Sequence, residues 1–582
     1  MKKTIKKVVA LSLTALTLGV STACNPFETL GPDEGEKINT DMSQLYLSNY
    51  NGGYGTEWLN EVKARFEDVY KEYSFEKDKK GVQVIIRSDK TGYSGQGLYD
   101  SMAGNRNDVF FSEAINYYDY VNAGYMLDIS DVVNDIEEQY NKLDENKDGK
   151  TILSKMTGEQ IDYLTTSENK VYALPHYVGV NGITYDIDLF NTKQLYYAKN
   201  GVASEDYALD KDTYGGYSGK VAYTNLAGKK SAGPDGKHGT YDDGLPATYE
   251  EFFALCKYMA SAAKGIQPFT MTGQYNDGYT STLLSALTAN YEGVEQTMLN
   301  YTFSGEAKNL AKVVDGNIVK DAQSTFITNK NGYELARQMG KYYALEFIEG
   351  IVSYFDNKSW ADEDSHVAAQ TRYLRSSYLG QPIAFLVEGN WWENEASATF
   401  KELAKADESY SKMNRKLGFM PLPKATNDEI GKGSTLIDNL FGFAFINGDI
   451  EESKIELAKT FLKFCYTDYS LVKYTTSTGT LKAMDYELDD TAYGQLSTFG
   501  KSVWDLYHDE NTRVVYQYSK NPLYLNNQST FKMHELFKTT SGAGVFTSLV
   551  KNGIKAESYF AGMNAYLSQT KWASAYAPYF DN

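Results

Sequence analysis

Short apolar segments with strand character alternate with amphipathic helical segments near the start of the chain. Residues 45–49 predict a strand that ends in a glycine-rich turn, and apolar side chains recur at helical spacing over residues 57–70. Residues 81–87 and 108–111 predict two further strands, and a helical segment follows at 115–123. This alternation predicts a layered α/β domain with a largely parallel sheet.

Ligands of open α/β sheets bind beyond the carboxyl ends of the strands. This rule points to two loops, residues 50–55 after the first strand and residues 112–116 after the third. The first loop is rich in glycine, but it lacks the G-x-G-x-x-G spacing of a dinucleotide site, and Tyr54 would crowd a pyrophosphate. We therefore reject a dinucleotide site at this loop.

The composition of the chain narrows the class of ligand. The 582 residues include 57 Lys and Arg against 76 Asp and Glu, and the resulting formal charge of −19 argues against binding of nucleic acid. There are 49 Tyr, 27 Phe and 6 Trp but 5 His, which favours flat stacking surfaces over histidine-based or metal chemistry. Aromatic side chains also fill ordinary cores, but tyrosine in Gly-, Asn- and Asp-rich loops favours stacking on sugars.

The start of the chain predicts export and lipidation. Four lysines among the first seven residues precede an apolar stretch, residues 8–20, that is too short to span a bilayer. Small residues then lead to Cys24, which predicts a signal peptide over 1–23 and a diacylglyceryl group on the cysteine. Ser21 stands where a lipobox has a large aliphatic residue, so ordinary signal-peptidase cleavage that leaves Cys24 bare is the alternative. Residues 24–40 predict the lipid anchor and a flexible spacer.

Two acidic loops are candidate calcium sites. Residues 144–149 match the first half of an EF-hand loop, but Lys155 stands where a bidentate Glu belongs, which favours a plain turn. Asp235, Asp242 and Asp243 place three carboxylates within one loop, and they are the metal-ligand candidates of the chain. A solvated acidic turn is the alternative there. We predict no cofactor beyond this candidate structural calcium.

The other two cysteines, Cys256 and Cys465, lie in apolar segments with helical character. They predict buried free thiols and no disulfide framework.

Several segments share, in order and at similar spacing, the motifs of one protein family. Among them are Y-A-L-P at 172–175, G-N-W-W at 389–392 and G-x-x-P-x-P at 418–423. The matching segments are 46–66, 107–113, 124–129, 171–175, 182–190, 384–392 and 418–423. Together they resemble extracellular solute-binding protein family 1, the sugar-binding lipoproteins of ABC importers that include the maltose-binding protein.

This resemblance implies a periplasmic-binding-protein-like fold of type II, in which two α/β lobes joined by a hinge close on a ligand in the cleft between them. It places lobe 1 at residues 41–184 and 434–502, and lobe 2 at residues 185–433 and 503–582. Residues 191–244, rich in Gly, Tyr, Asp and Lys, look like an insertion relative to the family.

The resemblance also implies a set of ligand-binding residues. Trp391 matches the stacking tryptophan of the family, and because adjacent residues point opposite ways we expect one of Trp391 and Trp392 in the cleft and the other in the core, with Trp391 favoured in the cleft. Tyr279 matches an aromatic residue that lines the cleft from lobe 2. Amides and carboxylates in the loops at the strand ends would bind sugar hydroxyls, with turn stabilisation as the alternative. The full set of candidates is Asn49, Asn51, Glu113, Asn116, Tyr279, Trp391 and Trp392.

By this resemblance the chain is a non-catalytic lipoprotein that captures an oligosaccharide and delivers it to an ABC transporter permease. We expect a monomer on the extracellular face of the cell membrane of a Gram-positive bacterium, held there through its lipid anchor. A peptide-binding importer lipoprotein, a surface adhesion module and a secreted glycoside hydrolase are the alternatives. A hydrolase needs two carboxylates that flank the sugar bond, and Glu388, Glu393 and Glu395 are the residues that could supply them.

Overall fold

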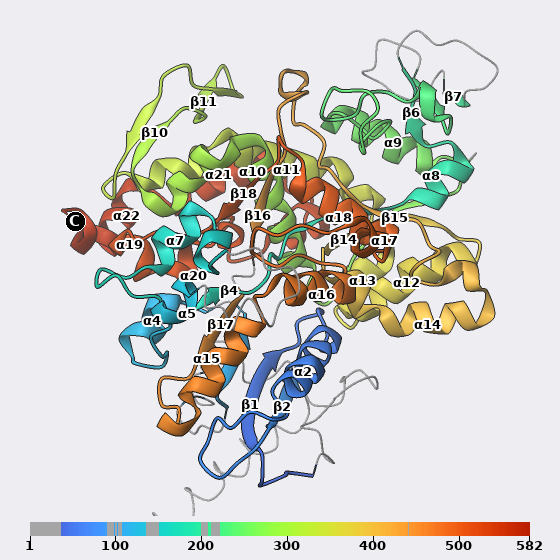
Figure 1. The fold of residues 1–582 in the computed structure, drawn as a ribbon. Coiled ribbons are helices and arrows are strands. Elements are labelled where there is room, and N and C mark those ends of the chain that lie inside the picture. The colour runs from blue at the N-terminus through green and yellow to red at the C-terminus, as the bar shows by residue number, and fades with distance from the viewer. Residues whose placement is uncertain are drawn as a thin grey trace, which may run out of the picture.

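The computed structural model of the protein describes residues 37–89, 98, 102, 107–113, 115–135, 150–199, 208–210, 221–262, 264–439 and 442–581. The predicted signal peptide, Cys24, most of the spacer and the acidic loop at 144–149 lie outside the described residues. Within the described part of the chain, no helix is long and apolar enough to cross a membrane. Figure 1 shows two α/β bodies that the chain passes between more than once.

Lobe 1 is built on a five-stranded sheet in the order β2-β1-β3-β17-β4. β1 pairs in parallel with β2 and β3, whereas β17 runs antiparallel to β3 and to β4. The three strands predicted near the start of the chain are thereby confirmed as parallel neighbours. The strands are β1 (Ser43–Tyr50), β2 (Val82–Asp89), β3 (Val109–Ser112), β4 (Leu174–Pro175) and β17 (Phe443–Ile446).

Helix α2 (Glu57–Val69) covers this sheet because its apolar residues recur every three or four positions. It buries Trp58, Leu59, Val62 and Phe66. The Phe66 ring meets Phe461 and Phe464 of α15 (Ile455–Phe464) at centroid distances of 5.0 and 5.3 Å. Full burial of such side chains contributes about 1.5–3 kcal/mol each. Helix α16 (Asp468–Thr478), which follows α15 in the chain, also packs against α2.

Lobe 2 is built on a four-stranded sheet in the order β15-β5-β14-β9. β5 runs antiparallel to β14 and β15, and β14 runs parallel to β9. The strands are β5 (Asn181–Asp186), β9 (Gln267–Thr270), β14 (Ile383–Gly389) and β15 (Leu417–Met420). Alternate residues of β14 enter different cores: Phe385 packs on Phe252 at 5.1 Å, while Leu386 joins the cluster that contains Tyr373.

Helices cover both faces of the second sheet. Phe252 lies on α9 and Tyr373 on α12, so these helices lie on opposite faces. The covering helices are α9 (Tyr249–Ala260), α10 (Asn276–Thr302) and α11 (Met339–Ile351) on one face, and α12 (His366–Tyr378), α14 (Ser397–Ala406) and α18 (Thr498–His508) on the other. Cys256 on α9 and Cys465 after α15 are buried and free, as the sequence predicts.

The first passage of the chain between the sheets occupies residues 176–180, between β4 and β5. The predicted lobe boundary between residues 184 and 185 falls inside β5, so it lies several residues too late. A strand cannot be divided between two sheets when all of its residues pair within one of them, as β5 does with β14 and β15.

The other two predicted boundaries are also displaced. β16 (Thr435–Asp438) pairs in parallel with β18 (Arg513–Tyr516) and packs on α10 of lobe 2, so the return to lobe 1 comes after residue 438 and not at 434. The boundary predicted at 502/503 falls inside α18, whose Phe499 packs on Phe419 of β15 at 6.1 Å. Both displacements arise because packing partners distant in sequence, not local composition, decide which lobe a segment joins.

Part of the predicted insertion at 191–244 forms a small three-stranded sheet in the order β6-β8-β7. It follows α8 (Ile187–Lys193) and lies at the upper right of Figure 1. The Tyr223 ring of β8 stacks on Tyr258 of α9 at 4.2 Å and 6°, which fixes the insertion to lobe 2. The strands are β6 (Tyr196–Tyr197), β7 (Ala208–Asp210) and β8 (Val221–Thr224).

Two short hairpins and several small helices complete the described structure. The hairpin strands are β10 (Gly305–Ala307) with β13 (Thr325–Ile327), and β11 (Ala311–Val314) with β12 (Asn317–Lys320). The remaining α-helices are α4 (Tyr117–Asn122), α5 (Ser130–Asn134), α7 (Gly158–Leu164), α13 (Trp392–Glu395), α17 (Asp490–Gly494), α19 (Pro522–Leu525), α20 (Gln528–Phe531), α21 (Ala556–Tyr566) and α22 (Gln569–Tyr576).

Candidate functional site

Trp391 lies where the two lobes meet. It follows β14, its side chain is 8% exposed, and its ring lies 6.3 Å from that of Tyr54 in the glycine-rich turn of lobe 1. A Cβ atom at Gly53 would lie 2.6 Å from Trp391 Cδ1, and the φ of Gly53 is +104°. Glycine is therefore required at this position both by the backbone conformation and by the approach of the indole. The indole contacts a loop at the carboxyl end of β1, where α/β sheets bind ligands.

A second contact joins the same two loops. The Asn394 side chain donates from Nδ2 to the Gly53 carbonyl oxygen at 3.1 Å. Within the turn, the Asn51 Oδ1 atom accepts from the Gly55 amide at 3.1 Å, which is the turn-stabilising role that competed with ligand binding for this residue. Asn49 is buried at the end of β1. These hydrogen bonds hold the turn in the shape that receives Trp391.

Trp392 lies in the core, away from the interlobe contact. It is fully buried, and its ring meets Tyr373, Phe400 and Phe499 at 5.8, 6.2 and 5.6 Å. Trp391 and Trp392 thus occupy the two different environments expected of adjacent residues. Ligand binding by either residue stays a prediction.

Glu113 follows β3 and lies against the same turn from the lobe 1 side. Its Oε2 atom accepts from the Tyr177 hydroxyl at 2.6 Å, and a Cβ atom at Gly52 would lie 2.7 Å from this oxygen. Burial and the Glu113 carboxylate raise the pKa of Tyr177 well above its usual value. The Tyr54 and Tyr177 rings lie 4.2 Å apart. Glu113 therefore lies beside a pair of packed aromatic rings.

Asn116 lines a small cavity of about 10 Å³ between lobe 1 and the segment after β18, room for about one water molecule. The Asn116 amide donates to Asp119 at 3.1 Å within its own helix turn. The rings of Tyr163 and Tyr518 stack in the cavity wall at 4.4 Å and 3°. Lys532 also lines the cavity, and burial lowers the pKa of its amine, against an opposing effect from Glu535 and Glu113.

Tyr279 of α10 meets a carboxylate cluster at the end of β14. Its hydroxyl donates to Glu388, and burial, Glu388 and Glu395 raise its pKa well above the usual value. Gln370 donates from Nε2 to Glu388 Oε1 at 3.1 Å and to Glu395 Oε2 at 2.9 Å. His366 Nε2 lies 3.2 Å from Glu395 Oε1. Burial and the neighbouring Glu395 raise the pKa of Glu388 to about 7.

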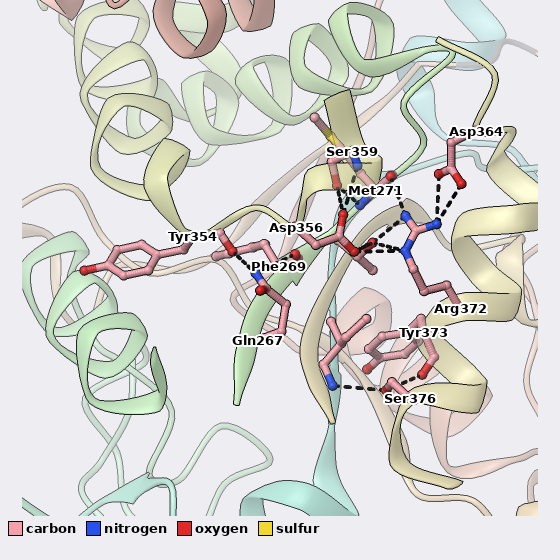
Figure 2. Close-up of polar contacts among 12 residues, drawn as sticks. Gln267, Phe269, Met271, Tyr354, Asp356, Ser359, Asp364, Arg372, Tyr373 and Ser376 are labelled. Carbon is pink, nitrogen blue, oxygen red and sulfur yellow. Dashed lines mark hydrogen bonds and ion pairs between the residues drawn. The ribbon is translucent and has the colours of Figure 1, made fainter. Parts of the chain in front are cut away.

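Helix α12, which carries His366 and Gln370, is fixed in place by Arg372. Figure 2 shows the guanidinium between two carboxylates: Nε lies 2.9 Å from Asp356 Oδ2, and Nη1 lies 2.8 Å from Asp364 Oδ1. A planar guanidinium that bonds two carboxylates holds a helix more firmly than a single exposed ion pair does. The ion pairs therefore orient the face of α12 that meets Glu388.

Asn390, the residue between β14 and Trp391, connects the loop after β14 to residues 176–180, the first segment that links the two lobes. Its Nδ2 donates to the Val178 carbonyl oxygen at 2.9 Å, its Oδ1 accepts from the Val180 amide at 3.3 Å, and its own amide donates to the Val180 oxygen at 3.0 Å. The second passage joins this arrangement through Asp438, whose Oδ1 accepts from the Gly179 amide at 3.1 Å.

The remaining residues considered from sequence have structural contacts. Glu393 accepts from Ser497 at 2.7 Å and does not join Glu388 and Glu395. Asp235, Asp242 and Asp243 accept from backbone amides or hydroxyls of their own loop. Across the described residues, no group of three His, Cys, Asp or Glu side chains converges in a way that could hold a metal ion. The calcium site stays a prediction, and the loop contacts favour the acidic-turn alternative.

Sequence reasoning did not single out Tyr177, Gln370 or Asn390. Tyr177 directly follows the Y-A-L-P motif and its histidine, and Asn390 lies inside G-N-W-W, so the motifs themselves were the available signal. Gln370 carries no such signal, because its contact with Glu388 depends on the placement of α12 across the sheet.

Comparison with known proteins places the fold. No family model and no curated protein matches the sequence. A chitin oligosaccharide binding protein matches with a TM-score of 0.52 and 14% identity over 92% of this chain and 100% of that chain. The fold is that of a two-lobed solute-binding protein. A structure from a study of xylan utilization by the thermophilic bacterium Caldanaerobius polysaccharolyticus matches with a TM-score of 0.51 and 14% identity, over 90% and 100% of the two chains.

These likenesses confirm the predicted two-lobed α/β solute-binding fold. Small-molecule sites occur preferentially between domains, and Trp391, Gly53, Glu113 and the Glu388 cluster lie in the region between the two lobes.

Proposed function

We propose that the protein captures an oligosaccharide between its lobes and delivers it to the permease of an ABC transporter, without changing it chemically. The observation that carries this proposal is the position of Trp391, an aromatic ring on a rigid loop of lobe 2 against the strand-end turn of lobe 1. A ring so placed can stack on the C–H face of a sugar, while Glu113 and the amides of the turn supply hydrogen-bond partners.

The ligand class is tested by a thermal-shift screen followed by calorimetry. Neutral and amino oligosaccharides of several linkages are compared with oligopeptides of two to five residues. A ligand that binds the folded protein raises its melting temperature by mass action. We expect stabilisation by oligosaccharides; stabilisation by peptides alone would assign the chain to peptide import instead.

A hydrolase is the rival that one observation favours, since Glu388 and Glu395 lie close enough to share the Gln370 amide. A catalytic pair must flank the scissile bond, whereas these two carboxylates converge on one donor from the same lobe. We expect the cognate sugar to be recovered intact after prolonged incubation with the protein. Appearance of shorter sugars, lost in the Glu388→Gln variant, would establish hydrolysis.

We further propose that Cys24 is lipidated and holds the protein at the outer face of the membrane. Two acyl chains on one residue give stable anchoring where a single chain does not. Wild-type protein should partition into the detergent phase, and the Cys24→Ala variant should be released into the medium. Wild-type protein in the aqueous phase would mean that the bond before Cys24 is cut by ordinary signal peptidase.

A further inference from the structure

The lobe 2 side of the interlobe region contains a buried carboxylate that has no ion-pair partner among the described residues. Glu388 is 1% exposed and accepts from Gln370, from the Gly389 amide at 3.0 Å and from the Tyr279 hydroxyl, all of them neutral donors. A basic side chain that acts on it is His366, whose Nε2 lies 3.2 Å from Glu395 Oε1. Buried carboxylates are normally paired or protonated.

Glu395 adds a second carboxylate to the same donor. The two carboxylates share the Gln370 nitrogen. Burial and then the nearby Glu395 carboxylate raise the pKa of Glu388 to about 7, against the hydrogen bond from Gln370, which lowers it. Near neutral pH the pair therefore retains a proton for part of the time, since two close negative charges disfavour full ionisation. A cation supplied by a ligand can take the place of that proton.

Two aromatic side chains lie near these carboxylates, Trp391 of lobe 2 and Tyr50 of lobe 1. The Trp391 ring lies against Gly389, where an added Cβ atom would come within 2.2 Å of the indole, so the ring and the Glu388 backbone are immediate neighbours. After burial, Glu113 and Glu395 are the groups that raise the pKa of Tyr50, which places this phenol near carboxylates of both lobes. Aromatic faces next to carboxylates attract ammonium groups.

Two buried polar atoms in this region have no hydrogen-bond partner within the described structure. The Tyr54 hydroxyl belongs to a side chain that is 3% exposed, and Glu113 and Glu395 are among the groups that act on it. The second atom is Oε1 of Gln370, the residue that bridges Glu388 and Glu395. Buried polar atoms are rarely left without partners, so these two indicate positions for ligand groups.

We infer that the interlobe site takes an amino sugar, an oligosaccharide with a protonated amine that is received by Glu388 and Glu395 beside Trp391. This inference rests on the proposed function, because it concerns the ligand of the same site. A hydroxyl or an N-acetyl amide can donate a hydrogen bond to these acceptors, but neither supplies the positive charge that Glu388 lacks.

The test is calorimetry with matched sugars near pH 7, where amino sugars are still partly protonated and Glu388 is partly ionised. The probes are glucosamine, galactosamine and the di- and trisaccharides of chitosan, each compared with its N-acetylated and its 2-hydroxyl counterpart. We expect at least one amine to bind roughly tenfold more tightly than both counterparts, the usual effect of one charge-assisted hydrogen bond. The advantage should shrink as salt is raised.

Variants assign the preference to the named residues. Glu388→Gln removes the charge of Glu388 with little change in size, and it should bring the affinity ratio of each amine to its neutral counterparts down to within about twofold. Glu395→Gln should act in the same direction and serves if the first variant folds poorly. The matched control is Glu402→Gln on α14, where Glu402 pairs with Arg375 on the outer surface of lobe 2.

The failure of this inference differs from failure of the proposed function. If neutral sugars bind and no amine of the panel binds more tightly than its counterparts, the inference is overturned and oligosaccharide binding stands. An amine preference that survives in both Gln variants also overturns it, since the cation would then be held elsewhere. If no oligosaccharide of any kind binds in the screen, the proposed function itself is wrong.

Discussion

Trp391 and Trp392 are adjacent in the chain, but their side chains lie in different environments. The Trp391 ring reaches across to lobe 1 through Gly53, whereas the Trp392 ring is enclosed by Tyr373, Phe400 and Phe499. β14 ends at Gly389, Trp391 is the N-cap of α13 and Trp392 is its first residue, so the two side chains leave the chain in different directions. Substitution at the two positions should therefore change different properties of the protein.

Trp391→Ala should weaken binding of the cognate sugar and should lower the stability less than Trp392→Ala does, because Trp391 is the more exposed of the two. Loss of one stacking contact is worth about 1 kcal/mol, or roughly fivefold in affinity. Trp392→Ala should instead lower the stability by about 3–5 kcal/mol, because it opens a cavity in a packed core. Calorimetry and urea denaturation measure the two effects. Unchanged affinity in the Trp391 variant would show that the ring is not a binding platform.

Lys482 is a second residue whose properties depend on its local environment, which lowers the pKa of its amine. It is fully buried, its Nζ lies 2.6 Å from His176 Nδ1, and the rings of Trp58 and Tyr474 each lie 4.8 Å from it. Burial lowers the pKa of Lys482 to about 7. The unfolded chain, with the ordinary lysine pKa near 10.4, thus binds a proton that the folded chain releases between these two pH values.

The contribution of Lys482 to the free energy of unfolding depends on pH. Between about pH 7 and pH 10 this lysine makes the folded state more stable as pH rises, since the unfolded state binds more protons there. Lys482→Met removes the effect, so the melting temperature of the variant relative to wild type should be most favourable near pH 7 and decline towards pH 10. Lys571→Met, at an exposed position, is the control and should show no such trend. A parallel pair of profiles would contradict the assignment.

At the scale of elements, the loop after β14 and the passage at 176–180 behave as one unit. Asn390 makes three hydrogen bonds to Val178 and Val180, and its side chain is buried. A side-chain amide that satisfies a donor and an acceptor of a neighbouring backbone segment acts as a cross-link between them. The loop that presents Trp391 is thereby held to the first segment that connects the lobes.

Asn390→Ala should destabilise the protein by about 2–4 kcal/mol, because it leaves a buried amide and a buried carbonyl without partners. Hydrogen exchange should accelerate most at the Val180 amide, which Asn390 accepts from. Asn414→Ala, which removes an exposed contact to the Glu408 carbonyl at 2.9 Å, is the matched control and should cost well under 1 kcal/mol. Equal losses in the two variants would contradict the role given to Asn390.

The sequence predicted the elements better than it predicted their assignment to lobes. The strands β1 to β3 and helix α2 were recognisable because apolar spacing is a local property. The passage into β5, the position of β16 and the middle of α18 were misplaced because they depend on partners such as α10 and β15. Within the site, Trp391 and Glu113 followed from motifs, while the pairing of Gln370 with Glu388 and Glu395 required the orientation that Arg372 gives to α12.

At the scale of the whole molecule, the contact between Gly53 and Trp391 decides how closely the lobes approach. Gly53→Ala should hold the lobes apart, because its methyl group would meet the indole at 2.6 Å and its φ of +104° disfavours any side chain. Small-angle scattering should report a larger radius of gyration than for wild type. Hinge motions of this kind need only a few residues to change conformation.

Gly124→Ala separates the two causes of this effect. Gly124 also has a positive φ, +73°, but no heavy atom lies within 4 Å of the position of its Cβ. Gly124→Ala should lower the stability by about 1–2 kcal/mol, the cost of a side chain at a positive φ, without changing the radius of gyration. If both variants expand equally, backbone strain and not the indole contact explains the result.

The contact between the two lobes at Gly53 and Trp391 has a consequence for the proposed ligand. A ligand that stacks on Trp391 must first displace the Gly53 turn, and its apparent affinity is reduced by the fraction of molecules in which that contact is closed. A monosaccharide covers little more than the ring itself, so it gains few new contacts in exchange for those it breaks. A longer chain that also reaches Glu113 and the Glu388 cluster gains several. On the proposed function, we therefore expect the glycine-rich turn to favour longer sugars over monosaccharides.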